Sequence, residues 1–210
     1  MDGTLLDSMG LWLNAGKYYL EGLGKKAEDN LGEKLLEMNM AEGALYLQKN
    51  YGLSLSVTEI SRGINETLKK NYAENVCLKS GVLDFLTRAR EKHIKTAICT
   101  NTDRLLFAPG LERLGLYKYF DEIVTCSEEH TSKAKPDIFF SVAKKLKSAP
   151  ERTVVFEDAL YALKTARNAG FLTCGVFDKI TQSYTDPEKI RHFSNFYLED
   201  WSEAERVLGI

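Results

Sequence analysis

Apolar residues in the first third of the chain recur at helical spacing. Between Gly10 and Asn75 they repeat every three or four positions, which places them on one face of a helix. Gly52 interrupts the pattern. Ser56, with Glu59 three residues later, then matches a capping box, in which two side chains satisfy free backbone donors at a helix start. This pattern predicts a small helical bundle.

From Leu78 onward, short runs rich in β-branched residues alternate with helical patterns. The runs predict strands at Lys95–Cys99, Glu122–Thr125, Thr153–Phe156, Leu172–Val176 and Asn195–Leu198. Strands that alternate with helices favour right-handed crossovers and a parallel sheet covered on both faces. We therefore expect an α/β fold, with a Rossmann-like parallel-sheet core formed by residues 1–9 and 76–210 and a helical domain, residues 10–75, inserted into it.

Polar side chains follow two of the predicted strands, at the strand ends where parallel sheets bind ligands. Thr100 and Asn101 follow the first of these strands, although an isolated Thr-Asn pair also suits a turn or a helix cap. Glu157 and Asp158 follow the strand Thr153–Phe156. Two adjacent carboxylates there repel each other unless a cation joins them. A helix cap would explain Asp158 but not Glu157.

A lysine stands just before the amphipathic helix predicted over Ile138–Leu146. Pro136 suits the first turn of that helix. Lys133, in contrast, gains nothing from the positive end of the helix dipole. This favours a functional role for Lys133, with a solvated surface lysine as the alternative.

The chain opens with Met1-Asp2-Gly3-Thr4-Leu5-Leu6-Asp7-Ser8. Alone, Asp-Gly-Thr predicts a turn, because glycine tolerates positive φ and aspartate bonds to its own backbone. Asp2, Thr100, Lys133 and the pair Glu157-Asp158 nevertheless occur in the order of four motifs that define the haloacid dehalogenase (HAD) superfamily. The resemblance covers essentially the whole chain. It is closest to the branch of β-phosphoglucomutase and phosphoglycolate phosphatase, whose helical cap domain follows the first motif.

The resemblance implies a phosphatase that hydrolyses a small phosphorylated metabolite through an aspartyl-phosphate, with Mg²⁺ as cofactor. Asp2 would protonate the leaving oxygen and later activate water, and its backbone carbonyl would bind the metal. Thr100 and Asn101 would bind a phosphoryl oxygen, and Lys133 would offset negative charge near it. Asp158, with Glu157 directly or through water, would hold Mg²⁺.

The family's first motif is Asp-x-Asp-Gly-Thr-Leu-x-Asp-Ser, in which the first Asp is the nucleophile. Met1 stands at x, so we expect the nucleophile and its strand to lie upstream of residue 1. We also expect the strands that end at Thr100 and Glu157 not to pair with each other. Two alternatives follow: a non-catalytic or truncated protein that binds phosphate and Mg²⁺ without turnover, or a start codon assigned to an internal methionine.

The helical domain and the composition narrow the function further. Residues 36–40 lack the Gly- and Arg-containing loop that sugar phosphomutases carry, which argues against a mutase.

With 28 basic and 30 acidic residues the net charge is −2, so nothing favours nucleic acid or an anionic membrane as a partner. The four cysteines form no C-x-x-C pair, and the three histidines show no metal spacing. We expect a cytoplasmic monomer or weak homodimer with a small-molecule substrate.

Overall fold

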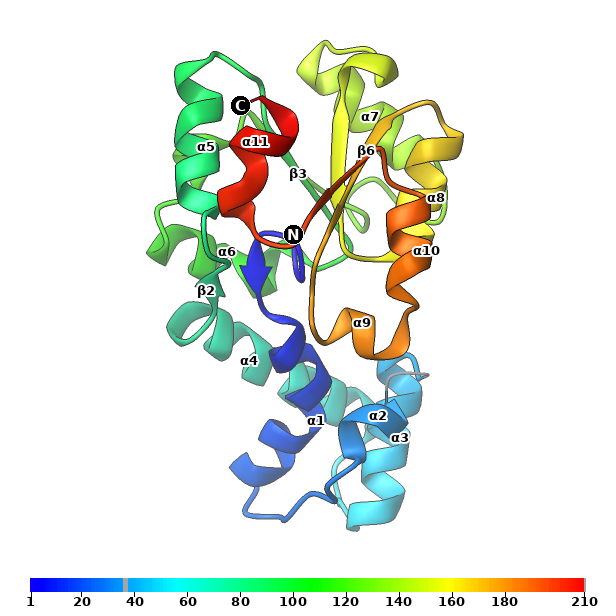
Figure 1. Ribbon diagram of the computed structural model, residues 1–210. Helices are drawn as coiled ribbons and strands as arrows, with labels where there is room; N and C mark the ends of the chain where they lie inside the picture. Colours follow the sequence, from blue (N-terminus) through cyan, green and yellow to red (C-terminus); the bar gives the residue numbers. More distant parts are fainter. Residues whose placement is uncertain (36–37, 210) are drawn as a thin grey trace. The chain divides into compact units, whose positions relative to one another are not determined.

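The computed structural model describes residues 1–35 and 38–209, so the expectation for residues 36–40 falls partly outside the described residues. The chain forms two compact units. The α/β unit comprises Met1–Met9, Cys77–Arg104 and Leu111–Ile210, and the helical unit comprises Gly10–Val76 and Leu105–Gly110. Figure 1 labels the elements of both.

The helical unit is built from α1 (Met9–Gly22), α2 (Leu31–Leu35), α3 (Met40–Tyr51) and α4 (Val57–Glu74). The predicted capping box at the start of α4 is confirmed, because Ser56 and Glu59 bond to each other's backbone N–H groups. A second capping box, which the sequence analysis missed, joins Asn39 and Glu42 at the start of α3. The core of the unit includes the fully buried side chains Leu20, Leu31, Leu47, Ile60, Leu68 and Tyr72.

Residues 105–110 were expected in the α/β core but belong to the helical unit. They lie in α6 (Arg104–Arg113), whose Gly110 comes close to the backbone of Tyr72 in α4. A Cβ atom on Gly110 would lie only 2.7 Å from the carbonyl oxygen of Tyr72, so the two backbones approach more closely than a side chain would allow. This long-range packing has no signature in the local sequence.

Five strands of the α/β unit confirm the predicted runs: β3 (Ala97–Thr100), β4 (Glu122–Thr125), β5 (Val154–Glu157), β6 (Leu172–Val176) and β7 (Phe196–Leu198). All of their pairings are parallel. Among the described residues, β3 pairs with β4, and β5, β6 and β7 form a separate ladder. As expected, β3 and β5 do not pair with each other. A short antiparallel pair, β1 (Leu6–Asp7) with β2 (Cys77–Leu78), was not predicted from the sequence.

Helices cover the strands on two faces, as the α/β prediction requires. The helices of this unit are α5 (Val82–Glu91), α7 (Asp137–Leu146), α8 (Leu160–Asn168), α9 (Thr181–Tyr184), α10 (Pro187–His192) and α11 (Ala204–Leu208), with single 3-10 turns at Tyr117–Tyr119, Pro150–Arg152 and Trp201–Glu203. Figure 1 shows α5 and α11 on one side of the strands and α7, α8 and α10 on the other.

The two faces have separate cores. On the α7 and α8 side, Ile138, Ala162 and Phe171 pack with Val124 of β4. On the α5 side, the rings of Phe85, Phe156 and Trp201 pack together, with centroids 4.8–5.5 Å apart. Because residues along a strand alternate between faces, Phe156 and its neighbours in β5 contribute to both cores. These contacts on both faces fix where the carboxyl end of β5 lies.

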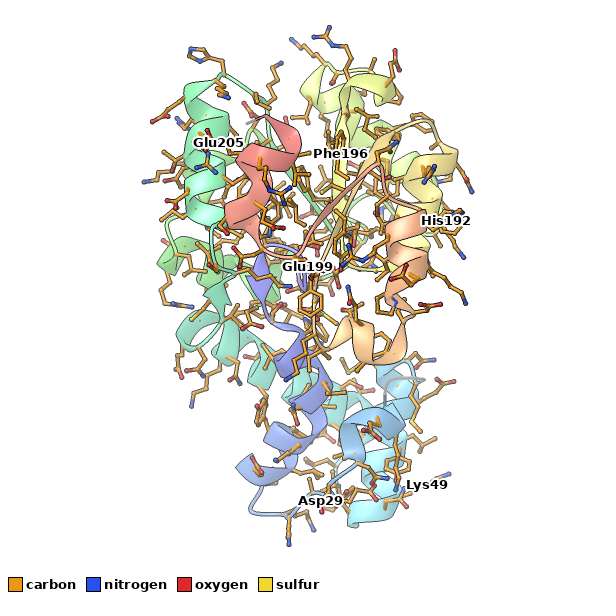
Figure 2. The ribbon with its side chains drawn as sticks, in the orientation of Figure 1. Asp29, Lys49, His192, Phe196, Glu199 and Glu205 are labelled. Atoms are coloured by element: carbon orange, nitrogen blue, oxygen red, sulfur yellow. The ribbon has the colours of Figure 1, made fainter. Side chains whose placement is uncertain are left out.

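The helical unit contains a hollow of about 630 Å³, lined by Lys26, Ala27, Glu28, Asp29, Lys34, Tyr46, Asn50 and Tyr51. Figure 2 labels Asp29 at this end of the unit. The Glu28 carboxylate there is already bonded to Lys34 and to the hydroxyl of Tyr46. None of the site residues expected from the sequence lies in this hollow.

Candidate active site

The first loop closes on itself and lies directly against the acidic pair. The carbonyl oxygen of Met1 accepts the N–H groups of Leu5 and Leu6 at 2.8 and 3.0 Å. Gly3 adopts a left-handed conformation with φ of +67°, and a Cβ there would lie 2.3 Å from Oδ2 of Asp158. The turn that Asp-Gly-Thr predicts is therefore present, and only glycine fits its closest approach to Asp158.

The Asp2 carboxylate is held from two sides. Its Oδ1 accepts a hydrogen bond of 2.7 Å from the hydroxyl of Ser8, and its Oδ2 accepts one of 2.8 Å from the hydroxyl of Thr102. The backbone N–H of Thr102 donates to Oγ1 of Thr100 at 3.1 Å. Thr102 thus joins Asp2 to Thr100, although the two are 98 residues apart in the chain.

Lys133 forms an enclosed ion pair with Glu157. The two side chains are only 8% and 4% exposed. Burial alone would lower the pKa of Lys133, but the negative charge of Glu157 outweighs it and raises that pKa. The lysine therefore stays charged, and its burial excludes the alternative of a solvated surface residue.

Asp158 does not cap the helix that follows it. The N-cap position of α8 is Ala159, which makes no side-chain capping bond. Instead, Oδ1 of Asp158 accepts the hydroxyl of Thr4 at 2.8 Å, and Oδ2 accepts the hydroxyl of Thr181 at 2.7 Å. Burial, and then the nearby charge of Glu157, raise the pKa of Asp158. The carboxylate thus lies in a place that disfavours its negative charge.

Asn101 is exposed, and its side-chain amide donates a 2.7 Å hydrogen bond to the hydroxyl of Tyr161 in the first turn of α8. Burial, and then the charge of Glu157, raise the pKa of Tyr161, so its hydroxyl keeps its proton. Asn101 and Thr100 lie at the same strand end.

The structure therefore brings together the residues expected from the four motifs, within one edge of the α/β unit. Several polar partners of these residues were not predicted from the sequence: Ser8, Thr102, Tyr161, Asp178 and Thr181. One signal was available for Asp178, because it follows the end of β6 as Thr100 ends β3. Thr181 and Tyr161 lie inside helices, where a threonine or tyrosine carries no distinguishing pattern.

The histidine and cysteine side chains lie outside the carboxylate pair. Among the described residues, no group of three or more His, Cys, Asp or Glu side chains is placed to hold a metal ion. His93, His130 and His192 are exposed, and Figure 2 labels His192 on α10. Cys126 and Cys174 are buried, Cys99 is half-buried and Cys77 is exposed, all as free thiols. No helix of the described residues is long and apolar enough to cross a membrane.

Residues 1–176 match the family model described as haloacid dehalogenase-like hydrolase. The chain belongs to this family. A phosphorylated carbohydrates phosphatase from Thermotoga maritima is 30% identical over 170 residues, which cover 81% of this chain and 79% of the relative. The curated relatives of this chain also include a phosphoglycolate phosphatase from Agrobacterium fabrum. The chain is a hydrolase of this phosphatase type.

Solved structures agree with this assignment. A Thermotoga maritima protein, provisionally described as a β-phosphoglucomutase, has a TM-score of 0.84 and 27% identity over 97% of this chain and 93% of that one. CbbY from Rhodobacter sphaeroides, solved in complex with phosphate, has a TM-score of 0.76 at 22% identity, with 97% and 93% of the two chains covered. The second similarity supports the fold alone. The expected α/β fold of the HAD family is confirmed.

Proposed function

We propose that this protein is a Mg²⁺-dependent phosphomonoesterase that acts on a small phosphorylated metabolite in the cytoplasm. The observation that carries the proposal is the enclosed Lys133–Glu157 pair beside Asp158. The first loop connects this pair to Thr100, because Thr4 bonds to Asp158 and Asp2 is joined to Thr100 through Thr102. A buried cation next to hydrogen-bond donors suits a ligand with concentrated negative charge. In this proposal the helical unit serves as the family's cap domain.

The phosphoryl group would lie against Lys133, Thr100 and Asn101. Lys133 supplies a positive charge that burial does not remove. The hydroxyl of Thr100 accepts from the backbone of Thr102, which leaves its own hydrogen free to point at a phosphoryl oxygen. Tyr161 anchors the amide of Asn101 on the same edge. Donors fixed in advance stabilise developing charge without having to reorganise during the reaction.

Asp2 is the proposed general acid and base. Hydrogen bonds from the hydroxyls of Ser8 and Thr102 hold the Asp2 carboxylate in one orientation. A carboxyl group in this position can give a proton to the leaving oxygen and later take one from water. Phosphate esters need such a proton donor, whereas halides do not, so Asp2 favours phosphatase over dehalogenase chemistry.

The residues present fit Mg²⁺. This ion typically uses one or two carboxylates and fills its remaining positions with water and substrate phosphate, so a cluster of three acidic side chains is not required. Asp158 has a raised pKa, and each of its oxygens accepts one hydroxyl, so a further lone pair on each remains to bind a cation. Asp158, Glu157 and the backbone carbonyl of Asp2 would hold the metal. When bound, it would offset the combined negative charge of substrate and carboxylates.

The acceptor of the phosphoryl group is the remaining part of the proposal. In the family motif this is an aspartate two positions before Asp2, a position outside the 210-residue sequence. With that carboxylate in place, the reaction would proceed through an aspartyl-phosphate that water then hydrolyses. The phosphatase names of the relatives support a small phosphorylated substrate.

Calorimetric titration with inorganic phosphate, with and without Mg²⁺, tests the site without requiring turnover. We expect the 210-residue chain to bind phosphate more tightly when Mg²⁺ is present, and Lys133→Met to weaken binding by roughly tenfold or more, the typical value of a charged hydrogen bond. The matched control is Lys135→Met, because Lys135 is exposed two residues away. Absence of phosphate binding, or equal affinities for both variants, would count against the proposed site.

A further inference from the structure

The two oxygens of Asp158 are held by two threonines from distant parts of the α/β unit. Thr4 comes from the first loop, and Thr181 comes from α9, beyond the end of β6. Thr4 and Thr181 are each 2% exposed and Asp158 is 4% exposed. Because a hydroxyl donates to each oxygen, the carboxylate plane cannot turn without breaking a buried hydrogen bond.

Thr181 is itself fixed by a buried acid. Oδ1 of Asp178 accepts the backbone N–H groups of Ile180 and Thr181 at 3.0 and 2.9 Å. Asp178 is 4% exposed, so this contact is shielded from water. The acid sets the backbone at the start of α9 and thereby sets where the Thr181 hydroxyl lies.

Lys79 balances the negative charge of Asp178 and also bonds to the backbone of the first loop. Its Nζ lies 2.9 Å from Oδ2 of Asp178 and donates to the carbonyl oxygen of Phe177 at 2.6 Å. The backbone N–H of Lys79 donates to the carbonyl oxygen of Leu5 at 2.9 Å. Leu5 follows Thr4 directly, so the contacts form a closed network that runs from Thr4 through Asp158, Thr181, Asp178 and Lys79 back to the first loop.

We infer that Lys79, Asp178 and Thr181 are positioning residues that hold Asp158 in one orientation for a divalent cation. The inference rests on the proposed Mg²⁺ site and assigns to it a support that the four family motifs do not contain. None of the three residues needs to touch the cation or the substrate. Their effect passes through Thr181 to Oδ2 of Asp158, opposite the oxygen that Thr4 holds.

A buried ligand that is free to rotate binds a metal less well than one already in place. Loss of a partner that orients a metal ligand typically lowers metal affinity 10–100-fold. Thr181→Val keeps the shape of the side chain but removes the hydroxyl, so it should lower metal affinity by roughly tenfold or more. Thr181→Ser keeps the hydroxyl and should bind the metal within about threefold of the unaltered protein, since its donor remains.

The test is the affinity for the metal alone, with Mg²⁺ measured by calorimetry and Mn²⁺ by electron paramagnetic resonance on the purified chain. Thr173→Val is the matched control. Thr173 is as buried as Thr181, but its hydroxyl donates to the carbonyl oxygen of Phe193, away from Asp158. We expect Thr173→Val to leave both affinities unchanged while Thr181→Val lowers them.

Three results decide between the claims. If the unaltered chain binds metal and Thr181→Val binds it equally well, the positioning role is wrong and the proposed site stands. If the control loses as much affinity as Thr181→Val, the effect is one of general stability and the positioning role is again wrong. If the unaltered chain binds neither ion, the proposed metal site fails and this inference fails with it.

A second variant covers the case in which Thr181→Val does not fold. Asp178→Asn keeps the side-chain shape and one oxygen acceptor for the α9 backbone but removes the charge that pairs with Lys79. It should also weaken metal binding, with Lys79→Met giving a change in the same direction. Normal metal affinity in both of these folded variants would overturn the positioning role of Lys79, Asp178 and Thr181.

Discussion

Lys133 and Glu157, 24 residues apart in the chain, form an ion pair that is almost entirely enclosed. Removing one member leaves the other charge buried without a partner, which typically costs about 3–5 kcal/mol. We predict that Lys133→Met lowers the free energy of unfolding by about this amount, because Glu157 then lies uncompensated beside Asp158. Urea denaturation followed by circular dichroism measures the change.

The double variant Lys133→Met/Glu157→Gln is the control for this prediction. With both charges gone, no unpaired charge remains buried, and the double variant should be more stable than Lys133→Met alone. If the losses in the free energy of unfolding caused by Lys133→Met and by Glu157→Gln simply add in the double variant, the two charges are not coupled in the way their geometry indicates.

Tyr161 offers a test of the phosphate-binding edge. Tyr161→Phe removes the hydroxyl that accepts the amide of Asn101 and leaves the ring in place. Affinity for inorganic phosphate should fall by roughly 2–10-fold, the value of one neutral hydrogen bond. Tyr117→Phe is the matched control, since the two tyrosines are 41% and 47% exposed. Equal phosphate affinities for both variants would remove Asn101 and Tyr161 from the proposed site.

The pair Arg104–Glu128 makes part of the stability dependent on pH. Arg104 Nε and Nη2 lie 2.6 and 2.8 Å from the two carboxylate oxygens of Glu128, and this contact lowers the pKa of Glu128 to about 2. Because the pKa of Glu128 is lower in the folded than in the unfolded protein, the pair contributes to the free energy of unfolding above about pH 4.5. This contribution is lost as the pH falls towards 2. Both side chains are more than a third exposed, so the contribution is small.

The corresponding prediction compares the unaltered protein with Glu128→Gln. The difference in denaturation midpoint between them should be constant from pH 7 to about pH 5 and should shrink by pH 3. A difference at pH 3 as large as that at pH 7 would contradict the lowered pKa of Glu128.

The sequence predicted the elements that depend on local pattern. The β-branched runs identified β3 to β7, because a strand buried on both faces needs such side chains throughout. The pair Glu157-Asp158 indicated a cation at a strand end, and the cost of two adjacent buried charges applies before any fold is known. The capping box at Ser56 was visible because its partner lies only three residues away.

The features it could not predict depend on contacts between distant residues. The division of α6 between the units follows from the close approach of Gly110 to Tyr72, 38 positions earlier in the chain. The support of Asp158 by Thr181 requires the return of the chain after β6. A hydroxyl residue inside a helix has no local mark that separates a structural hydrogen bond from one that orients a ligand.

Asp2→Asn tests the proposed acid and base. The amide keeps an oxygen for Ser8 or Thr102 to bond, so the local structure should persist while the proton-transfer function is lost. In a protein that carries the motif's aspartate before Met1, turnover should fall by roughly 10²–10⁴-fold. Asp84→Asn, an exposed position in α5, should retain full turnover. Full turnover by Asp2→Asn would refute the role.

The most direct test of the account is phosphate release by two forms of the chain that differ in one residue. One form carries a short apolar strand that ends in Phe-Asp directly before Met1, and the other carries the same strand ending in Phe-Asn. With Mg²⁺ and a panel of small phosphomonoesters, we predict that the Phe-Asp form releases phosphate and that excess chelator stops it. The Phe-Asn form should bind phosphate with Mg²⁺ but release none from the esters. Equal release by the two forms, or no release by the Phe-Asp form, would contradict the proposed phosphatase mechanism.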